Sequence, residues 1–242
     1  MLNTNDLLKI FKEKYKNGEF RIINDDPKKK TVEIQNAHFV ADKDWILRKP
    51  DYEYARREIA WYDTMSLYIK DIPDKIPIIW KDVCDINGKI NSNYGWCIYS
   101  EENGSQYKNC LYNLSHDSCS RQGVMIYNRP SMHNDSIKNH MHDFMCTFAT
   151  QCFLNKCKDG YDLKYIVYQR SCDAIFGFNS DHLWHKEVQK RLANDLEIEF
   201  NKKKKEDEEP IHIHCMPIEF NCGSIHVYSR HFNFLEDNEG ED

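Results

Sequence analysis

Cys146 and Arg170 form the pair of residues in this sequence with the clearest potential for chemistry. Cys146 lies in a strand-like segment, residues 144–153, and Arg170 directly follows the next such segment, residues 164–169. If the two segments form neighbouring strands, the guanidinium can favour the thiolate of Cys146, because a nearby cation lowers the pKa of a thiol. A thiolate held in this way is a potential nucleophile. Without such a neighbour, a cysteine on a strand is more typically an inert core residue.

The remaining cysteines are interpreted as reduced core thiols. The sequence has ten cysteines among 242 residues, too small a share for a secreted disulfide scaffold, and its N-terminus does not resemble a signal peptide. No two cysteines have the two-residue gap of a zinc knuckle or a redox motif. The cluster His212, His214, Cys215 and Cys222 alternates with apolar residues, which is typical of a strand. We therefore expect no metal site and no metal cofactor.

Composition excludes several classes of protein. The net charge is -6, and aromatic residues make up 13% of the chain, which argues against a nucleic-acid groove and against disorder. No apolar stretch is long enough to cross a membrane. We expect a cytoplasmic protein, in the host cytoplasm if it is virus-encoded, that binds neither membranes nor polymeric nucleic acid.

The spacing of apolar residues predicts one α+β domain over residues 1–242. No internal repeat or linker divides the chain, and the opposite charge runs at 202–205 and 206–209 indicate a polar surface insert near residues 201–210. The expected helices span residues 4–15, 52–70, 99–116 and 180–195. The expected strands are a hairpin over 20–23 and 31–35, then 123–127, 144–153, 164–169 and 196–200, with further strands near Ile211 and Ser224.

Several segments resemble the thymidylate synthase and deoxycytidylate hydroxymethylase superfamily. The string Tyr-Gln-Arg-Ser-Cys-Asp at residues 168–173 is similar to the superfamily's signature, and the spacing of Cys146 and Gln151 is similar to that on its nucleophile strand. Further matches follow in the same order as in the superfamily: Glu58 with Trp61, Trp80, Tyr94-Gly95-Trp96, Ser120-Arg121, and His226-Val227-Tyr228 with Arg230-His231. The resemblance implies a thymidylate synthase-like fold, in which a large mixed sheet is packed with helices and two copies form a sheet-to-sheet homodimer.

Within the superfamily, the sequence more closely resembles the phage deoxycytidylate hydroxymethylases. The nucleophile is flanked by Met145 and Thr147, whereas thymidylate synthases usually have Pro and His there. Asp181 stands where the superfamily places its base-reading residue, which is Asn in enzymes for uracil and Asp in enzymes for cytosine. The hydrogen-bonding groups of cytosine favour Asp, because a carboxyl group can accept a hydrogen bond from the N4 amino group and, when protonated, can donate one to N3. On its own, Asp181 would more often be a helix cap.

The resemblance implies conversion of dCMP to 5-hydroxymethyl-dCMP with 5,10-methylenetetrahydrofolate as cosubstrate. Cys146 is expected to add to C6 of the base, Glu58 to act as general acid and base and to orient water, and Asp181 to read the base. The expected substrate-binding residues are Arg170 and Ser171 for the phosphate, His226 and Tyr228 for the sugar, and also Gln151 and Tyr94. The expected folate-binding residues are Trp80, Asp173 and Gly177.

The phosphate site departs from the superfamily's pattern. Arg121 is expected to reach the partner subunit's phosphate site, but Gln122 stands where a second arginine is usual. No arginine aligns clearly with the N-terminal phosphate ligand, so Lys28 or Lys30 is the expected substitute. The sequence also ends at Asp242, soon after His231, so either another segment closes the site or the chain is truncated.

Other functions stay open at this point. A thymidylate synthase with a variant base reader, or a dUMP hydroxymethylase, would use the same residues. A catalytically silent protein that binds nucleotides or RNA on this fold would not need Cys146 or Glu58.

Overall fold

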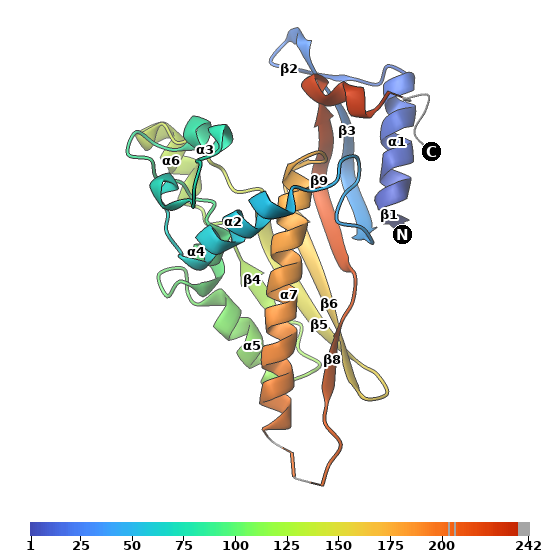
Figure 1. The fold of residues 1–242 in the computed structure, drawn as a ribbon, viewed down its shortest axis with the longest axis vertical. Coiled ribbons are helices and arrows are strands. Elements are labelled where there is room, and N and C mark those ends of the chain that lie inside the picture. Colours follow the sequence, from blue (N-terminus) through green and yellow to red (C-terminus); the bar gives the residue numbers. More distant parts are fainter. Residues whose placement is uncertain (203, 206, 237–242) are drawn as a thin grey trace.

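The computed structural model describes residues 1–202, 204–205 and 207–236, apart from the side chains of residues 136, 138 and 139. The acidic end of the chain and residues 203 and 206 of the expected polar insert lie outside the described residues. The rest of that insert connects a long helix to the last two strands (Figure 1).

A mixed sheet forms the frame of the described structure (Figure 1). Its main path runs β1-β3-β9-β6-β5-β4, with β2 paired to β3, β7 to β9 and β8 to β6. The strands are β1 (Leu2–Asn3), β2 (Arg21–Ile23), β3 (Asp26–Ala41), β4 (Val124–Ile126), β5 (Thr147–Lys156), β6 (Gly160–Gln169), β7 (Cys172–Asp173), β8 (His212–Cys215) and β9 (Ile218–Tyr228). The α+β prediction is therefore confirmed.

The helices are α1 (Thr4–Lys16), α2 (Tyr52–Asp63), α3 (Ile78–Val83), α4 (Tyr94–Tyr99), α5 (Gln106–His116), α6 (Met132–Asn139) and α7 (Gly177–Asn201), with short 3-10 turns at Ile69–Asp71 and Ser229–Phe234. Figure 1 shows α7 running along β5 and β6, with α2 crossing near its upper end and α5 beside its lower half. No helix of the described residues is long and apolar enough to cross a bilayer.

Two of the expected elements form, with their ends set by nearby side chains and backbone. Helix α1 begins at a capping box in which Asn3 and Asp6 bond each other's backbone. The hairpin turns at Asn24 and Asp25, both with φ of 53°, as a two-residue hairpin loop requires. Its second strand is longer than expected and extends to Ala41.

Two expected helices end or break where the backbone leaves the helical region. The helix expected over 52–70 ends at Asp63, because Met65 takes a φ of 55°. The helix expected over 99–116 is two helices, α4 and α5. Gly104 and Ser105 between them have φ values of 79° and 47°, which a continuous helix excludes.

The strand expected over residues 196–200 is wrong, since α7 continues to Asn201. Trp184, Val188, Leu192 and Leu196 recur every four residues and are fully buried. This helical stripe outweighs the local two-residue alternation that predicted a strand. The same stripe anchors α7 on the sheet and so fixes the position of Asp181 near its start.

Candidate active site

The predicted approach of Cys146 and Arg170 is confirmed. Strands β5 and β6 are antiparallel with Thr147 opposite Gln169, and the Arg170 backbone N–H donates to the Cys146 carbonyl at 2.9 Å. The strand expected over 144–153 begins only at Thr147, so Cys146 lies directly before it rather than on it. Arg170 Nη2 lies 3.9 Å from Cys146 Sγ, which places the cation next to the sulfur.

The loop that carries Cys146 holds the Arg170 guanidinium in place. Nε donates to the Met145 carbonyl at 3.0 Å and Nη2 to the Phe144 carbonyl at 2.5 Å, while the guanidinium carbon lies 5.1 Å from the centre of the Phe144 ring. No described residue accepts a hydrogen bond from Nη1. One edge of this fixed cation therefore remains available for an anion.

Burial opposes ionisation of the nucleophile in the free protein. Desolvation raises the pKa of the Cys146 thiol to about 12; the nearby Asp181 carboxyl adds to the rise, and Arg170 opposes it. The thiol is therefore protonated at neutral pH in the free protein.

Asp181 lies in the first turns of α7, beside Cys146 and Tyr94. Its Oδ2 accepts a hydrogen bond from Gln169 Nε2 at 2.6 Å. Burial and the charge of Glu58 raise the pKa of Asp181 to about 7, while hydrogen bonds from Gln169 and Tyr94 act in the opposite direction. Thr147 Oγ1 lies 3.3 Å from Tyr94 Oη. This carboxyl group is thus able to donate or accept a proton near neutral pH.

Glu58 is a buried acid on α2. Its side chain is 6% exposed, and Tyr54 Oη donates to its Oε1 at 2.7 Å. Burial raises the pKa of Glu58, while hydrogen bonds from Tyr54, Ser180 and Trp80 lower it. A raised pKa and polar contacts to α3 and α7 suit a group that exchanges protons in a reaction.

Three further predicted residues meet where β7 pairs with β9. Asp173 lies opposite His226, and the rings of His226 and Tyr228 are 4.7 Å apart. Burial lowers the pKa of His226, and the Asp173 carboxylate opposes this effect, so the imidazole is neutral at pH 7. Neutral His and Tyr side chains can both donate to and accept from a hydroxyl group. Ser171, next to Arg170, is half-buried.

Gly177 starts α7 near Asp173. A Cβ at Gly177 would lie 3.4 Å from Asp173 Cβ, an ordinary contact. The protein itself therefore does not require glycine here, and a role toward a ligand stays a prediction.

Four predicted substrate-binding residues make no contact with Cys146 in the described part of the chain. Gln151 bonds the backbone carbonyl of Arg121 at 3.0 Å and the hydroxyl of Tyr168 at 3.2 Å. Lys28 is exposed, and Lys30 Nζ lies 5.3 Å from the centre of the Phe20 ring. Any role of these residues toward a phosphate requires a second subunit or a movement of the hairpin.

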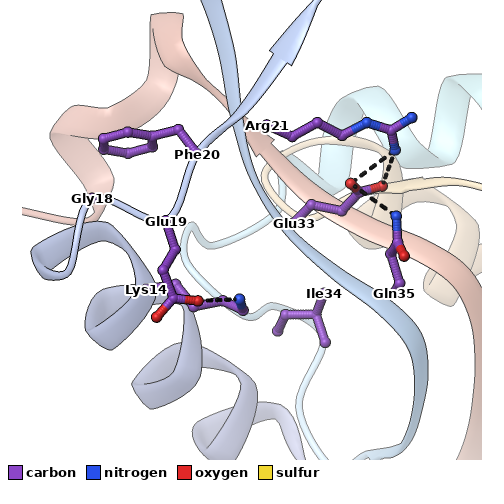
Figure 2. Close-up of a pocket in the computed structure, with 8 residues that line it drawn as sticks. All are labelled: Lys14, Gly18, Glu19, Phe20, Arg21, Glu33, Ile34 and Gln35. Atoms are coloured by element: carbon purple, nitrogen blue, oxygen red, sulfur yellow. Dashed lines mark hydrogen bonds and ion pairs between the residues drawn. The ribbon is translucent and has the colours of Figure 1, made fainter.

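A cleft of about 780 Å³ lies beside that hairpin and is not lined by Cys146. Figure 2 shows Arg21 and Glu33 on its wall, joined by two hydrogen bonds of 2.9 Å. Glu33 also accepts from Ser224 Oγ at 2.5 Å. Arg21 was not among the residues predicted for the site. Its pairing with Glu33 leaves little free positive charge for a phosphate.

Gln169 and Asp143 are positioning residues that the sequence analysis also missed. Gln169 is 1% exposed and donates to both Asp181 and Thr147. Asp143 accepts from the backbone N–H groups of Asn91 and Ser92 at 2.7 Å each, and from Ser92 Oγ at 2.6 Å. It therefore fastens the nucleophile loop to the segment that leads into Tyr94. For both residues, the only signal in the sequence is a polar side chain next to positions that are expected to be buried.

Replacing Asp143 with Ala is expected to lower the free energy of unfolding by about 3 kcal/mol, because three buried donors lose their acceptor. Urea unfolding measures the change. The matched control is Asp135→Ala, whose carboxylate accepts one hydrogen bond, from Asn91, and which should cost about 1 kcal/mol. Equal stability of the Asp143→Ala variant and the wild type would contradict this role.

Comparison with known proteins agrees with this arrangement. The family model described as thymidylate synthase matches residues 12–205. The chain belongs to the thymidylate synthase family. The crystal structure titled thermostable thymidylate synthase A from Bacillus subtilis is similar with a TM-score of 0.62 and 18% sequence identity, over 96% of this chain and 85% of that one. The fold is therefore that of thymidylate synthase.

Two curated relatives in this family come from Enterobacteria phages T4 and T6. Each is named deoxycytidylate 5-hydroxymethyltransferase and is 42% identical to this chain over 207 residues, which is 86% of this chain and 79% of the relative. Thymidylate synthase family enzymes use methylene-tetrahydrofolate and bind nucleotide and folate substrates.

Proposed function

We propose that this protein is a deoxycytidylate 5-hydroxymethyltransferase that converts dCMP to 5-hydroxymethyl-dCMP with 5,10-methylenetetrahydrofolate and water. The observation that carries the proposal is Asp181, a carboxyl group beside Cys146 whose pKa is raised to about 7. The names and identity of the phage relatives support the same reaction.

Asp181 suits cytosine and disfavours uracil. Cytosine offers an amino donor at N4 and an acceptor at N3. A protonated carboxyl group donates to N3 while its other oxygen accepts from N4, and a pKa near 7 keeps a large share of this form present at neutral pH. Uracil offers the reverse pattern: its N3–H suits a carboxyl oxygen, but its O4 is an acceptor that lies badly matched against the second oxygen whenever the group is ionised.

Cys146 acts as the nucleophile toward C6 of the base. Arg170, 3.9 Å from the sulfur, stabilises the thiolate as it forms. The covalent bond to C6 makes C5 electron-rich, so one difficult substitution becomes two feasible steps. The fixed position of Arg170 also lets its free edge hold the phosphate, with Ser171 beside it.

Glu58 orients and activates the water that completes the product. Its buried carboxyl group and its contacts with Tyr54 and Trp80 suit a general acid and base at neutral pH. Loss of tetrahydrofolate and of the C5 proton would leave an exocyclic methylene group on C5. Attack of this water on that carbon, with departure of the Cys146 sulfur from C6, gives the hydroxymethyl group. Neutral His226 and Tyr228 hold the sugar hydroxyl.

The residues near Glu58 and Asp173 fit a folate. Trp80 is half-buried and packs edge-on against Trp61 at 5.2 Å, offering an aromatic wall. Asp173 accepts the Ile175 backbone N–H through Oδ1 at 2.8 Å, and its Oδ2 can accept from a pterin N–H. Gly177 lies beside it. When bound, the methylene-folate supplies the one-carbon unit.

The second face of the sheet is the proposed homodimer interface. On β5 and β6 the buried residues that face α7 alternate with half-buried ones, among them Ala149, Ile166 and Tyr168. A half-buried, partly apolar sheet face is suited to burial against a second copy. Gln151 holds the backbone of Arg121 on this face. Arg121 can thereby contribute to the partner subunit's phosphate site.

The test is to incubate the protein with formaldehyde, tetrahydrofolate and either dCMP or dUMP, and to identify the products by mass spectrometry. We expect 5-hydroxymethyl-dCMP from dCMP and little turnover of dUMP. Thymidylate as the product, or turnover of dUMP alone, would contradict the proposal. Absence of any turnover would instead support a silent nucleotide-binding protein.

A further inference from the structure

Three metal-ligating side chains gather at one end of the sheet, apart from the active-site residues. Cys157 and Asp159 lie in the turn between β5 and β6, and His214 lies on β8. The ligand atoms of the three residues all lie within 4.8 Å of one another. Asp159 Oδ1 is 3.6 Å from Cys157 Sγ and 3.0 Å from His214 Nε2.

These separations are close to those of a tetrahedral zinc site. With Zn–S of about 2.3 Å and Zn–N or Zn–O of about 2.0 Å, neighbouring ligand atoms lie roughly 3.3 to 3.8 Å apart. Asp159 and His214 are exposed and Cys157 is half-buried, so small rotations of their side chains are enough to bring the three atoms to such distances.

The backbone holds the turn and the strand in a fixed relation. Cys157 N–H donates to the Gly160 carbonyl at 3.0 Å, and His212 N–H donates to the Asp159 carbonyl at 3.0 Å. A Cβ at Gly160 would lie 1.9 Å from the His212 carbonyl oxygen, so only glycine allows β8 to approach this closely. The pairing of β6 with β8 then sets His214 opposite Asp162.

A second histidine lies beside the cluster. The rings of His212 and His214 are 6.4 Å apart, and His212 Nδ1 lies 3.5 Å from Glu197 Oε1 on α7. A carboxylate on one ring nitrogen leaves the other nitrogen free, which is the usual arrangement around metal-bound histidines.

We propose that Cys157, Asp159 and His214 form a binding site for Zn²⁺ that fastens the β5–β6 turn to β8. Thiolate and imidazole ligands together select a borderline-soft cation such as Zn²⁺ over Mg²⁺ or Ca²⁺. Water or His212 completes the coordination.

This proposal revises the expectation of no metal site. That expectation concerned His212, His214, Cys215 and Cys222. Cys215 points away from His214 to the other face of β8, where its sulfur lies 3.9 Å from the Gln189 carbonyl. The true neighbours of His214 come from a turn far away in the sequence, and only the pairing of β6 with β8 brings them together.

The test is titration of the tag-free, reduced and chelator-treated protein with Co²⁺ as a spectroscopic substitute, followed by displacement with Zn²⁺. We expect one equivalent per chain, with a sulfur-to-cobalt charge-transfer band. Cys157→Ser should abolish this band, and His214→Asn should weaken affinity at least tenfold. The matched control is Cys215→Ser, an exposed thiol on the same strand, which should bind like the wild type.

Thermal unfolding supplies a second readout that does not depend on catalysis. Zn²⁺ should raise the melting temperature of the wild type and of Cys215→Ser, but not that of Cys157→Ser, because only a metal bound to the folded state stabilises it. Either of two results would overturn the proposal: no stoichiometric binding to the wild type, or unchanged binding in both Cys157→Ser and His214→Asn. Neither result bears on the dCMP reaction.

Discussion

Replacing Asp181 with Asn is expected to move the base preference of this protein from dCMP toward dUMP. The carboxyl group matches N3 and N4 of cytosine, whereas an amide matches the N3–H and O4 of uracil. A buried site that is built around one hydrogen-bonding pattern rejects the opposite pattern strongly, so the ratio of kcat/KM for dCMP to that for dUMP should fall by ~10³-fold or more. Steady-state kinetics with each nucleotide measures this ratio.

The control for this experiment is Asp173→Asn. Asp173 is the other half-buried carboxylate near the site, and it lies opposite His226 rather than beside Gln169. This variant should lose activity toward both nucleotides in similar proportion. An unchanged ratio in Asp181→Asn would remove Asp181 from the role of base reader.

The pH dependence of wild-type activity follows from the same group. Burial and Glu58 raise the pKa of Asp181 to about 7, so the protonated form that donates to N3 is lost as the pH rises through this value. The value of kcat/KM for dCMP should therefore decline above about pH 7. The activity of Asp181→Asn toward dUMP should lack this decline, because its amide does not titrate.

Replacing Cys146 with Ser is expected to abolish covalent catalysis. A serine hydroxyl is a far weaker nucleophile than a thiolate, so kcat should fall by ~10⁴-fold or more. The wild type should form a stable adduct with 5-fluoro-dCMP and methylene-tetrahydrofolate, visible as a mass increase of the intact protein, and the variant should form none.

An exposed cysteine provides the control for trapping. Cys119 is exposed, and Cys119→Ser should form the adduct as readily as the wild type. An adduct in Cys146→Ser would assign the nucleophile elsewhere, and the absence of an adduct in the wild type would indicate a silent binding protein.

Those parts of the fold that depend on local patterns could be predicted from the sequence. The first helix and the hairpin that follows it were predicted, because their apolar spacing and the polar turn between the strands are encoded within a few residues. The end of α7 could not be predicted from residues 196–200 alone, because five residues that alternate are compatible with either a strand or one side of a helix. The buried stripe that contains Leu196 decides for the helix.

The candidate site, like the fold, could be predicted from the sequence only in part. Cys146, Arg170 and Asp181 were predicted as site residues, and the structure brings them together: Arg170 lies 3.9 Å from Cys146 Sγ, and the Asp181 carboxyl group raises the pKa of the Cys146 thiol. Asp143 and Gln169 were missed because their partners lie far away in the sequence, at Asn91 and Asp181. Hydrogen bonds between distant segments leave no local periodicity. Contributions from a second subunit, expected for Arg121, are likewise invisible in one chain.

In the proposed reaction, water rather than hydride completes the product on cytosine, and an isotope measurement distinguishes the two. The wild type is given equal dCMP and dUMP with methylene-tetrahydrofolate in ¹⁸O-labelled water, and the products are analysed by mass spectrometry. We expect 5-hydroxymethyl-dCMP as the main product, with one ¹⁸O in the hydroxymethyl group. Thymidylate, or hydroxymethyl product formed mainly from dUMP, would contradict the proposed reaction.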